Sequence, residues 1–222
     1  MEKIVIIGGR GSAVVIAEQI YDTQIKLGNV EFLGFAFDDE TMGNSINDFP
    51  LLCKSNEVYE KYGKYEDVKF IYQLYRPDLM QERSKLLNTF NIPTEKFSTF
   101  IHHTATVARS AKIGFGTVVL ANCVINPNAI VGNHCTLHSN TLIGHDTKIG
   151  SFNFLAAHNV VGSSSEFGDG NFVGLNSTFN NYLSIGDYNF VGMASNVTKN
   201  LNHNQKVYGN PAKEFQTKIK PL

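Results

Sequence analysis

From Ile101 to Val197 the chain repeats an apolar residue at every sixth position without a slip in phase. The seventeen positions are Ile101, Val107, Ile113, Val119, Ile125, Val131, Leu137, Ile143, Ile149, Leu155, Val161, Phe167, Val173, Phe179, Ile185, Val191 and Val197. Neither an α-helix nor an alternating β-strand has a period of six, whereas a parallel β-helix built from hexapeptides does. The second half of the chain is therefore predicted to be such a β-helix.

Two further features of the hexads fit this prediction. Glycine follows the apolar residue in nine of the seventeen hexads, and the fifth place is mostly a small residue or Asn. We interpret the apolar residue as the filling of a narrow interior, the small residue as the point where the chain turns, and glycine as the residue that permits a positive φ. Each coil of a β-helix can bury its edge only by stacking on the next coil. An unbroken run of hexads, as found here, provides every inner coil with such a neighbour.

Residues 1–99 follow a different rule, in which short apolar strands alternate with helical patterns. The segments "KIVIIGG", "EFLGFAFDD" and "VKFIYQLY" are predicted strands. Ser12 to about Leu27 is a predicted amphipathic helix, and "PDLMQERSKLLNTF" is another. This alternation predicts a small parallel α/β domain. We therefore expect two domains, residues 1–99 and residues 100–222.

The overall composition excludes several classes of protein. The 19 basic residues nearly balance the 20 acidic residues, so the chain lacks the basic surface expected of a nucleic-acid-binding protein. No apolar run approaches the roughly 18–20 residues that cross a bilayer, so we expect no membrane insertion and a cytoplasmic location. The three cysteines lack CxxC spacing, and no regular ligand spacing is found among the histidines, so no metal is expected.

The hexad array is followed by "VYGNPAKEF" (Val207 to Phe215), and the N-terminal half contains "IIGGRGSAVV" and "FAFDD". With these segments the chain resembles the bacterial nucleotide-sugar acetyltransferases of the PglD/NeuD type. The resemblance implies a Rossmann-like domain that holds a nucleotide-linked amino sugar and a left-handed β-helix that binds acetyl-CoA. It also implies three hexads per coil, hence between five and six coils, and a homotrimer with each active site between neighbouring subunits.

The segment "IGHDTKIG" places His145 and Asp146 between two inward-facing isoleucines, at a turn where the side chains are predicted to point outward. An imidazole, with a reference pKa of about 6.5, can remove a proton from an attacking amine near neutral pH. A neighbouring carboxylate can orient the ring and stabilise the imidazolium. Two polar residues in a solvated turn would give the same pattern. The resemblance favours catalysis, because the matching segment of the family carries the base and a helper acid.

The loop Gly9, Arg10, Gly11 and Ser12 follows a strand and opens a helix, where backbone N–H groups can approach a phosphate. Val14 replaces the third glycine of a dinucleotide fingerprint, which disfavours NAD. The resemblance implies that this loop faces the acceptor. Asp38 and Asp39 end the second predicted strand and could bind a ribose or base, or simply cap a turn. His138 could contact the sugar or be a polar residue at a coil edge.

For acyl-CoA, the resemblance implies contacts along the later coils and the segment that follows them. The residues concerned are Phe154, Ser163, Gly192, Ala194, Lys199, Gly209, Pro211 and Lys213. Ser12, His138, Phe154 and His158 depart from the residues common in the family, which leaves the sugar and the acyl pocket open.

The leading interpretation is an acyltransferase that N-acetylates a nucleotide-linked amino sugar, of the 4-amino-4,6-dideoxy type, by direct transfer from acetyl-CoA. Two alternatives stay open. The first is O-acetylation of a sugar or transfer of a longer acyl chain. The second is a non-catalytic trimer that only binds the sugar nucleotide.

Overall fold

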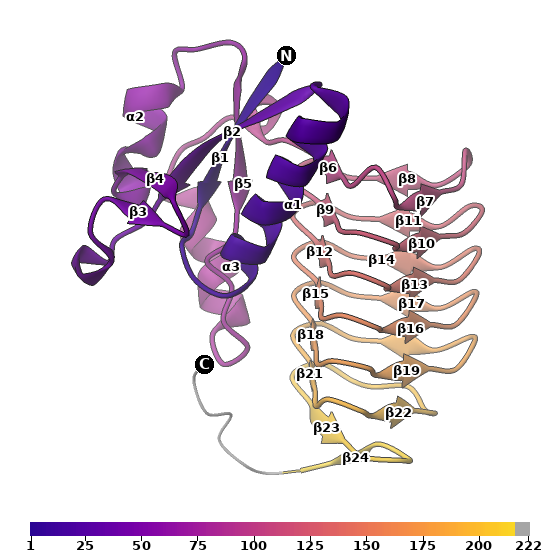
Figure 1. The fold of residues 1–222 in the computed structure, drawn as a ribbon. Helices are drawn as coiled ribbons and strands as arrows, with labels where there is room; N and C mark the ends of the chain where they lie inside the picture. Colours follow the sequence, from indigo (N-terminus) through magenta and orange to yellow (C-terminus); the bar gives the residue numbers. More distant parts are fainter. Residues whose placement is uncertain (216–222) are drawn as a thin grey trace.

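A computed structural model describes residues 1–215 and shows an α/β domain beside a long stack of short parallel strands (Figure 1). The N-terminal domain has one five-stranded sheet in the order β3-β4-β2-β1-β5, parallel except for the β3–β4 pair. Its strands are β1 Glu2–Ile7, β2 Val30–Ala36, β3 Ser45–Ile46, β4 Phe49–Cys53 and β5 Val68–Tyr72. Its helices are α1 Ser12–Leu27, α2 Val58–Tyr62 and α3 Met80–Asn88, with short 3₁₀ turns η1 Glu40–Met42, η2 Ser55–Glu57 and η3 Thr94–Lys96.

The predicted α/β elements are confirmed, with differences at their ends. Helix α1 has the predicted bounds and ends at Gly28, whose left-handed φ of 64° closes the helix with a hydrogen bond to the Gln24 carbonyl. Helix α3 is shorter than predicted, because Pro77 and the residues after it form a turn before the helix begins at Met80. The small antiparallel pair of β3 and β4 was not predicted, since β3 is only two residues long.

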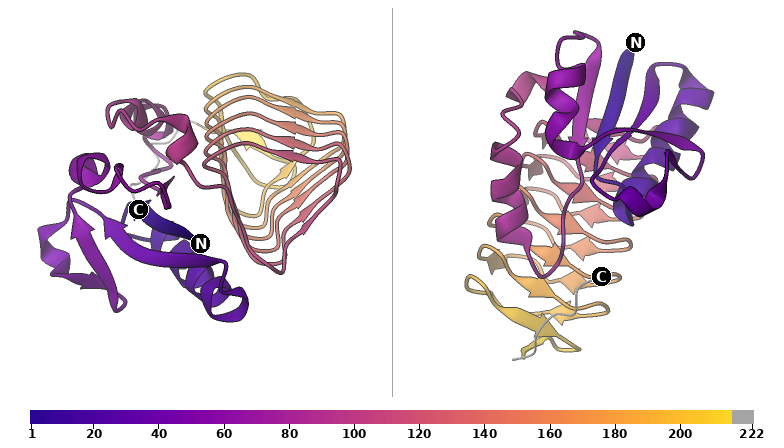
Figure 2. Two further views of the ribbon diagram at one scale, coloured as in Figure 1. Left: turned by 90° about the horizontal axis from the view of Figure 1, so that it is seen from above. Right: turned by 90° about the vertical axis from the view of Figure 1, so that its left-hand side faces the viewer.

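The C-terminal part is the predicted left-handed parallel β-helix, with a triangular cross-section (Figure 2). The six-stranded face contains β7 Thr106–Val107, β10 Val124–Ile125, β13 Leu142–Ile143, β16 Val160–Val161, β19 Thr178–Phe179 and β22 Asn196–Val197. The five-stranded face contains β8 Lys112–Ile113, β11 Ile130–Val131, β14 Lys148–Ile149, β17 Glu166–Phe167 and β20 Ser184–Ile185. The eight-stranded face contains β6 Phe100–Ile101, β9 Val118–Val119, β12 Thr136–Leu137, β15 Phe154–Leu155, β18 Phe172–Val173, β21 Phe190–Val191, β23 Lys206–Tyr208 and β24 Lys213–Glu214.

The apolar residue of each hexad fills the interior, as the period predicted. From Ile125 to Val197 these residues are at most 5% exposed and form one continuous core. Ile101 is an exception at 39% exposed, because its strand β6 lies at the end of its face, with no coil stacked beyond it. Partners in adjacent strands, such as Ile125 and Ile143, are one coil of three hexads apart.

The fifth places form a ladder of buried polar side chains beside this core. The Asn153 side-chain oxygen accepts a hydrogen bond from the Asn171 backbone N–H at 2.9 Å. The Asn171 oxygen accepts from Asn189 at 2.9 Å, and the Asn189 oxygen accepts from Gln205 at 2.7 Å. Buried amides are stable only when hydrogen-bonded, so each coil satisfies the backbone of the next.

The structure corrects the reason given for glycine in the hexads. None of the nine glycines that follow the apolar residue has a positive φ; the left-handed residues lie two places later, as His134, Asp146 and Asn176 do. Glycine is needed for close approach instead: a Cβ on Gly144 would lie 2.5 Å from the Ser163 nitrogen, and one on Gly162 would lie 2.5 Å from Asn180. The coils therefore stack too closely at these places for any side chain.

The N-terminal domain packs on the eight-stranded face, and the two parts share a core (Figures 1 and 2). Phe100, Val118 and Leu120 of the β-helix are buried in one cluster with the side chains of β1 and α1. Buried polar contacts reinforce the junction. The Gln73 amide donates to the Thr136 hydroxyl at 2.8 Å, and Tyr75 donates to the His134 carbonyl at 2.7 Å. The domain is thus held in a defined orientation on the β-helix.

Candidate active site

His145 and Asp146 lie on the turn between β13 and β14. The inward-facing Ile143 and Ile149 are at most 2% exposed, whereas the His145 side chain is 59% exposed, so the ring points outward as predicted. Asp146 occupies a left-handed backbone conformation with φ of 59°, which Asp tolerates better than most residues. This turn brings the His145 Nδ1 to 2.7 Å from the Asp146 Oδ2.

The hydrogen bonds around Asp146 fix the orientation of the pair. The hydrogen bond from His145, then that from Asn128, lower the pKa of the Asp146 carboxyl, so the carboxylate is charged and can only accept. His145 must then donate from Nδ1, and in the neutral ring the Nε2, which points away from the pair, carries the lone pair. Asn128 lies one coil earlier and donates to Asp146 at 2.9 Å. It was not predicted, although its place eighteen residues before Asp146 could have indicated it.

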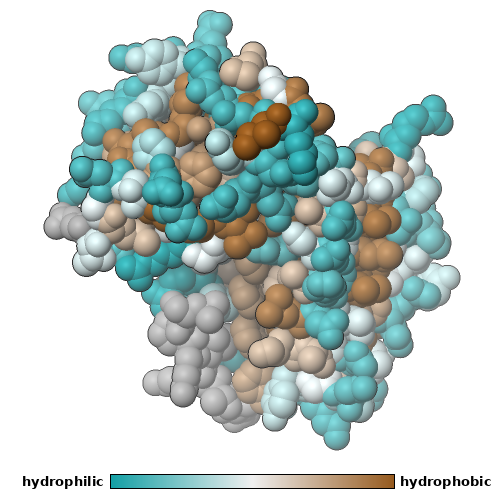
Figure 3. All heavy atoms as spheres, in the orientation of Figure 1, coloured by the Kyte–Doolittle hydropathy of each residue, from teal (hydrophilic) through white to brown (hydrophobic). Residues whose placement is uncertain are grey.

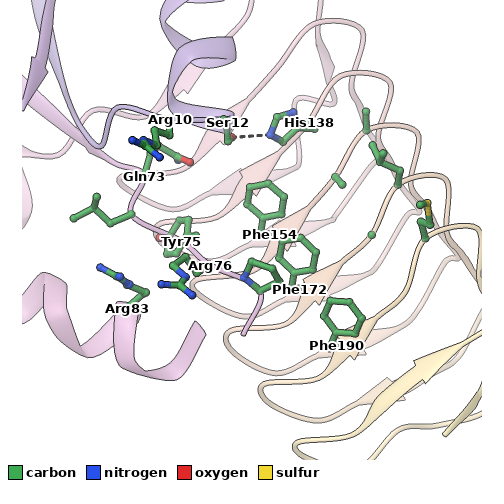
Figure 4. Close-up of a pocket in the computed structure, with 18 of the residues that line it drawn as sticks. Arg10, Ser12, Gln73, Tyr75, Arg76, Arg83, His138, Phe154, Phe172 and Phe190 are labelled. Atoms are coloured by element: carbon green, nitrogen blue, oxygen red, sulfur yellow. Dashed lines mark hydrogen bonds between the residues drawn. The ribbon is translucent and has the colours of Figure 1, made fainter. Parts of the chain in front are cut away.

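A second feature is a cavity of about 750 Å³ between the N-terminal domain and the β-helix (Figure 4). This volume is within the usual range for small-molecule sites. Among the predicted residues, Gly9, Arg10, Gly11, Ser12, His138 and Phe154 line it. The cavity therefore brings together the glycine loop that follows β1 and the residues at the edge of the eight-stranded face.

Ser12 and His138, two of the four residues that depart from the family pattern, contact each other in this cavity. The Ser12 hydroxyl lies 2.7 Å from the His138 Nε2 (Figure 4). Burial lowers the pKa of His138 to about 4, so the ring is neutral at physiological pH. The pair joins α1 to the β-helix and presents neutral hydrogen-bonding groups to a ligand.

Below His138, three phenylalanines form a ladder along the eight-stranded face. Phe154, Phe172 and Phe190 are one coil apart, with ring centroids separated by 4.9 Å and 5.6 Å and planes inclined by 3° and 4°. Because the rings cover one another's faces, the wall offers an apolar strip of ring edges (Figure 4). Phe172 and Phe190 were not predicted, but their eighteen-residue spacing from Phe154 is visible in the sequence.

The opposite wall comes from the segment after β5 and from α3. It includes Gln73, Tyr75, Arg76 and Arg83, none of which was predicted. The rule that ligands bind at the carboxyl ends of parallel strands could have indicated the residues after β5. Arg83 is a full helical turn inside α3, and no local sequence signal marks it.

Asp38 and Asp39 do not line the cavity. The Asp38 carboxylate accepts hydrogen bonds from the backbone N–H and the hydroxyl of Ser55. Asp39 accepts from the backbone N–H and hydroxyl of Thr41 and forms an ion pair with Arg10, and the contacts with Thr41 lower its pKa most. Both carboxylates have local partners, as the turn-capping alternative requires.

The residues predicted for acyl-CoA binding lie along the coils and the segment after them, outside the cavity except for Phe154. The Gly192 N–H donates to the Val207 carbonyl at 2.8 Å, and the Ala194 N–H donates to Leu175 at 2.7 Å. Contacts with CoA at these two residues would therefore use other groups. Ser163 follows His145 by one coil on the same turn, Lys199 follows β22, and Gly209, Pro211 and Lys213 lie at the final turn around β23 and β24.

The described residues contain one triad with metal-binding spacing, formed by Asp22, His102 and His103, whose ligand atoms lie within 4.8 Å of one another. The His102 Nδ1 accepts a hydrogen bond from the Thr104 backbone N–H at 3.2 Å, so Nε2 carries the proton and donates to Asp22 at 3.3 Å. A protonated Nε2 is no metal ligand, and Lys26 already pairs with Asp22 at 3.0 Å. This arrangement is an interdomain hydrogen-bond cluster.

Within residues 1–215, none of the helices has the length and apolar character needed to span a bilayer. Residues 110–145 match the family model described as bacterial transferase hexapeptide (six repeats). A sequence comparison with curated proteins gives no match.

Solved structures match the whole chain. A histidine variant of perosamine N-acetyltransferase from Caulobacter crescentus, in complex with CoA and GDP-perosamine, is 21% identical, with 98% of each chain covered and a TM-score of 0.81. The acetyltransferase domain of PglB from Neisseria gonorrhoeae, in complex with acetyl coenzyme A, is 20% identical, with 96% of this chain and 99% of that chain covered and a TM-score of 0.82. WeeI from Acinetobacter baumannii is 18% identical, with 97% of this chain and 100% of that chain covered and a TM-score of 0.79. The chain thus shares, over nearly its whole length, the fold of these three proteins, two of which are described as acetyltransferases, as its resemblance to the PglD/NeuD type predicted.

Proposed function

We propose that the protein is an acyltransferase that transfers the acetyl group of acetyl-CoA to the amine of a nucleotide-linked amino sugar, of the 4-amino-4,6-dideoxy type. The observation that carries the proposal is the outward-facing His145–Asp146 pair, in which Nδ1 contacts the carboxylate and Nε2 is left for a substrate. The fold is shared with an N-acetyltransferase whose structure contains CoA and GDP-perosamine, which supports the same class of acceptor.

In the proposed reaction, the amine nitrogen attacks the thioester carbonyl and forms the N–C bond. The His145 Nε2 takes the proton that the amine loses, and the charged Asp146 stabilises the imidazolium. Backbone N–H groups hold the developing oxyanion. When the intermediate collapses, the C–S bond breaks, and the proton passes from His145 to the CoA thiolate. The Asn128 hydrogen bond keeps Asp146 in place throughout.

We propose that the active site is completed by a second copy of the chain, in a homotrimer. His138 lines the cavity and precedes β13, whereas His145 follows β13 and does not line the cavity, so the two lie at opposite ends of one strand. The outward residues of the six-stranded face between them include Val124, Leu142 and Val160, which is 41% exposed. Figure 3 shows apolar surface over the β-helix. Covering this face with a neighbour would bring His145 of the partner subunit to the cavity.

A second candidate, transfer of a longer acyl chain, is favoured by the phenylalanine ladder. Its strip of ring edges runs along the β-helix for three coils and could contact methylene groups, which an acetyl group lacks. Acyl-CoA esters of increasing chain length, assayed with one acceptor, distinguish the two candidates. A preference for acetyl-CoA supports the first, and a preference for a longer chain supports the second.

The test of the proposed function is turnover with acetyl-CoA and a panel of UDP-, dTDP- and GDP-linked amino sugars, followed by thiol release and product mass. We expect an amide product, and a loss of kcat of about 10²–10⁴-fold in His145→Ala. His203→Asn, at an exposed histidine beyond the last hexad, is the matched control. Turnover with hydroxyl acceptors alone would replace N-acetylation by O-acetylation. Ligand-induced melting shifts without any turnover would favour a binding protein.

A further inference from the structure

The cavity beside the N-terminal domain carries charge of only one sign. Arg10, Arg76 and Arg83 line it, and no Asp or Glu does. The whole chain has nearly equal numbers of basic and acidic residues, so the excess is local. A cavity with three guanidinium groups and no carboxylate on its walls is suited to an anionic ligand.

Arg83 is the least satisfied of the three. Among the described residues its guanidinium has neither a hydrogen-bond acceptor nor a carboxylate within ion-pair distance, although the residue is partly buried. Its backbone is held in place, because the Arg83 carbonyl accepts a hydrogen bond from the buried Tyr72 hydroxyl at 2.5 Å. A partly buried cation without a partner is unfavourable, and a bound anion would satisfy it.

Arg76 and Arg10 differ in how far they are already neutralised. Arg76 makes two hydrogen bonds to Asp78, at 3.1 Å and 2.8 Å, which leave three of its five N–H donors for a ligand. The Arg10 side chain is 64% exposed and paired with Asp39. Arg10 belongs to the glycine loop predicted to approach a phosphate, yet Arg76 and Arg83 are the ones with unused donors, and they lie across from the phenylalanine ladder (Figure 4).

The place of these arginines in the sheet supports a phosphate ligand. Strand β1 pairs with β2 on one side and with β5 on the other, so the chain reverses its direction of travel across the sheet at β1. Open parallel sheets bind nucleotides in the crevice at such a point, outside the carboxyl ends of the strands. The glycine loop after β1 and the Arg76 segment after β5 are the two sides of that crevice.

We propose that Arg83, together with Arg76, binds the diphosphate group of a substrate in this cavity. The choice of a diphosphate rests on the proposed function, because both a nucleotide-linked sugar and CoA contain one. Two guanidinium groups offer paired donors that match phosphate oxygens. The glycine loop supplies backbone N–H groups on the opposite side of the same crevice.

The experiment is calorimetric titration of the full chain with UDP, GDP, dTDP, CoA and inorganic diphosphate. Arg83→Gln should weaken diphosphate binding about ten- to hundredfold, the effect of losing a charged hydrogen-bond donor. Arg76→Gln should weaken it less, because Asp78 already satisfies part of Arg76. Arg83→Lys should retain part of the affinity that Arg83→Gln loses, since it keeps the positive charge but lacks the paired N–H donors of a guanidinium group. Lys85→Gln, exposed on the same helix, should leave binding unchanged.

The ligands distinguish the source of the diphosphate. Weaker binding of the nucleoside diphosphates alone places the acceptor in the cavity, and weaker binding of CoA alone places the acyl donor there. Unchanged affinity for every ligand in Arg83→Gln and Arg76→Gln overturns the proposal, as does the absence of any binding by the unaltered chain. Melting temperatures of the variants show whether they are folded. Because binding is measured without turnover, an inactive protein whose nucleotide binding depends on Arg83 would refute the proposed function and leave this inference standing.

Discussion

Acidification should destabilise the protein through two imidazoles, those of the buried His134 and of the partly buried His138. Burial lowers the pKa of each to about 4, from an ordinary value of 6.5. His134 is 5% exposed, its ring is enclosed by Phe97, Phe115 and Phe152 at 4.6–5.2 Å, and its Nδ1 has no hydrogen-bond partner. Burial is the cause of the shift, and the described residues give the Nδ1 no acceptor that would favour the charged ring.

The direction of the effect follows from proton binding. Below pH 6.5 the unfolded chain takes up protons on these histidines while the folded chain does not, so the free energy of unfolding falls as the pH drops towards 4. A pKa difference of this size corresponds to about 3 kcal/mol for each histidine. The whole free energy of unfolding of a domain is about 5–15 kcal/mol. The loss from the two histidines should therefore leave the protein close to unfolding at the lower end of this range, near pH 4.

The measurement is urea unfolding at pH steps from 7.5 to 4, followed by circular dichroism, on the original chain and two variants. His134→Asn keeps a residue that tolerates the left-handed conformation, as Asn122, Asn128 and Asn140 do at equivalent turns. It should lose stability at pH 7.5 through poorer packing, yet show a smaller pH dependence than the original chain, because His138 and His102, whose pKa values burial also lowers, still contribute. His158→Asn, at an equivalent but exposed turn, should keep the full dependence. An unchanged slope in His134→Asn would refute the reasoning.

Three further predictions concern the pair, the coils and the junction. Asp146→Asn should keep the turn and lower kcat by at least about tenfold, measured by thiol release, with the acceptor KM little changed. Gly162→Ala, whose Cβ would lie 2.5 Å from the Asn180 carbonyl carbon, should lower the melting temperature more than Ala157→Ser, a similarly small change on another turn. Gln73→Leu leaves the buried Thr136 hydroxyl without its partner and should reduce the free energy of unfolding by about 1–3 kcal/mol in urea titrations; a change near zero would show that the bond contributes little to docking.

The sequence predicted the β-helix well because its rule is local and repeated. One residue in six must be apolar, so Ile143 and Ile149 alone determine that the His145 ring between them points outward. The same pattern did not reveal why glycine recurs, because the close contact between Gly144 and Ser163 joins residues from different coils. The sequence pattern shows which positions tolerate only certain residues. The stacked coils show the cause, which is close contact between residues of neighbouring coils.

The cavity was harder to predict, because its walls come from separate parts of the chain. Ser12 and His138 are 126 positions apart, and their contact depends on how the N-terminal domain docks on the β-helix. Arg83 has no motif around it, and its proposed role rests on the absence of an acidic residue from the cavity wall, which only the folded chain shows. Docking depends on contacts such as those of Gln73 and Tyr75, which no periodicity in the sequence indicates.

The ladder of buried asparagines has a consequence for how such a chain can vary. Because Asn153, Asn171 and Asn189 each satisfy the backbone of a neighbouring coil, the interior keeps its hydrogen bonds only when residues are gained or lost one whole coil at a time. The phenylalanine ladder on the outside has the same spacing. A duplicated coil would therefore lengthen the apolar wall of the cavity by one ring while leaving His145, Asp146 and the arginines in place. The depth of the site can change in steps of one coil.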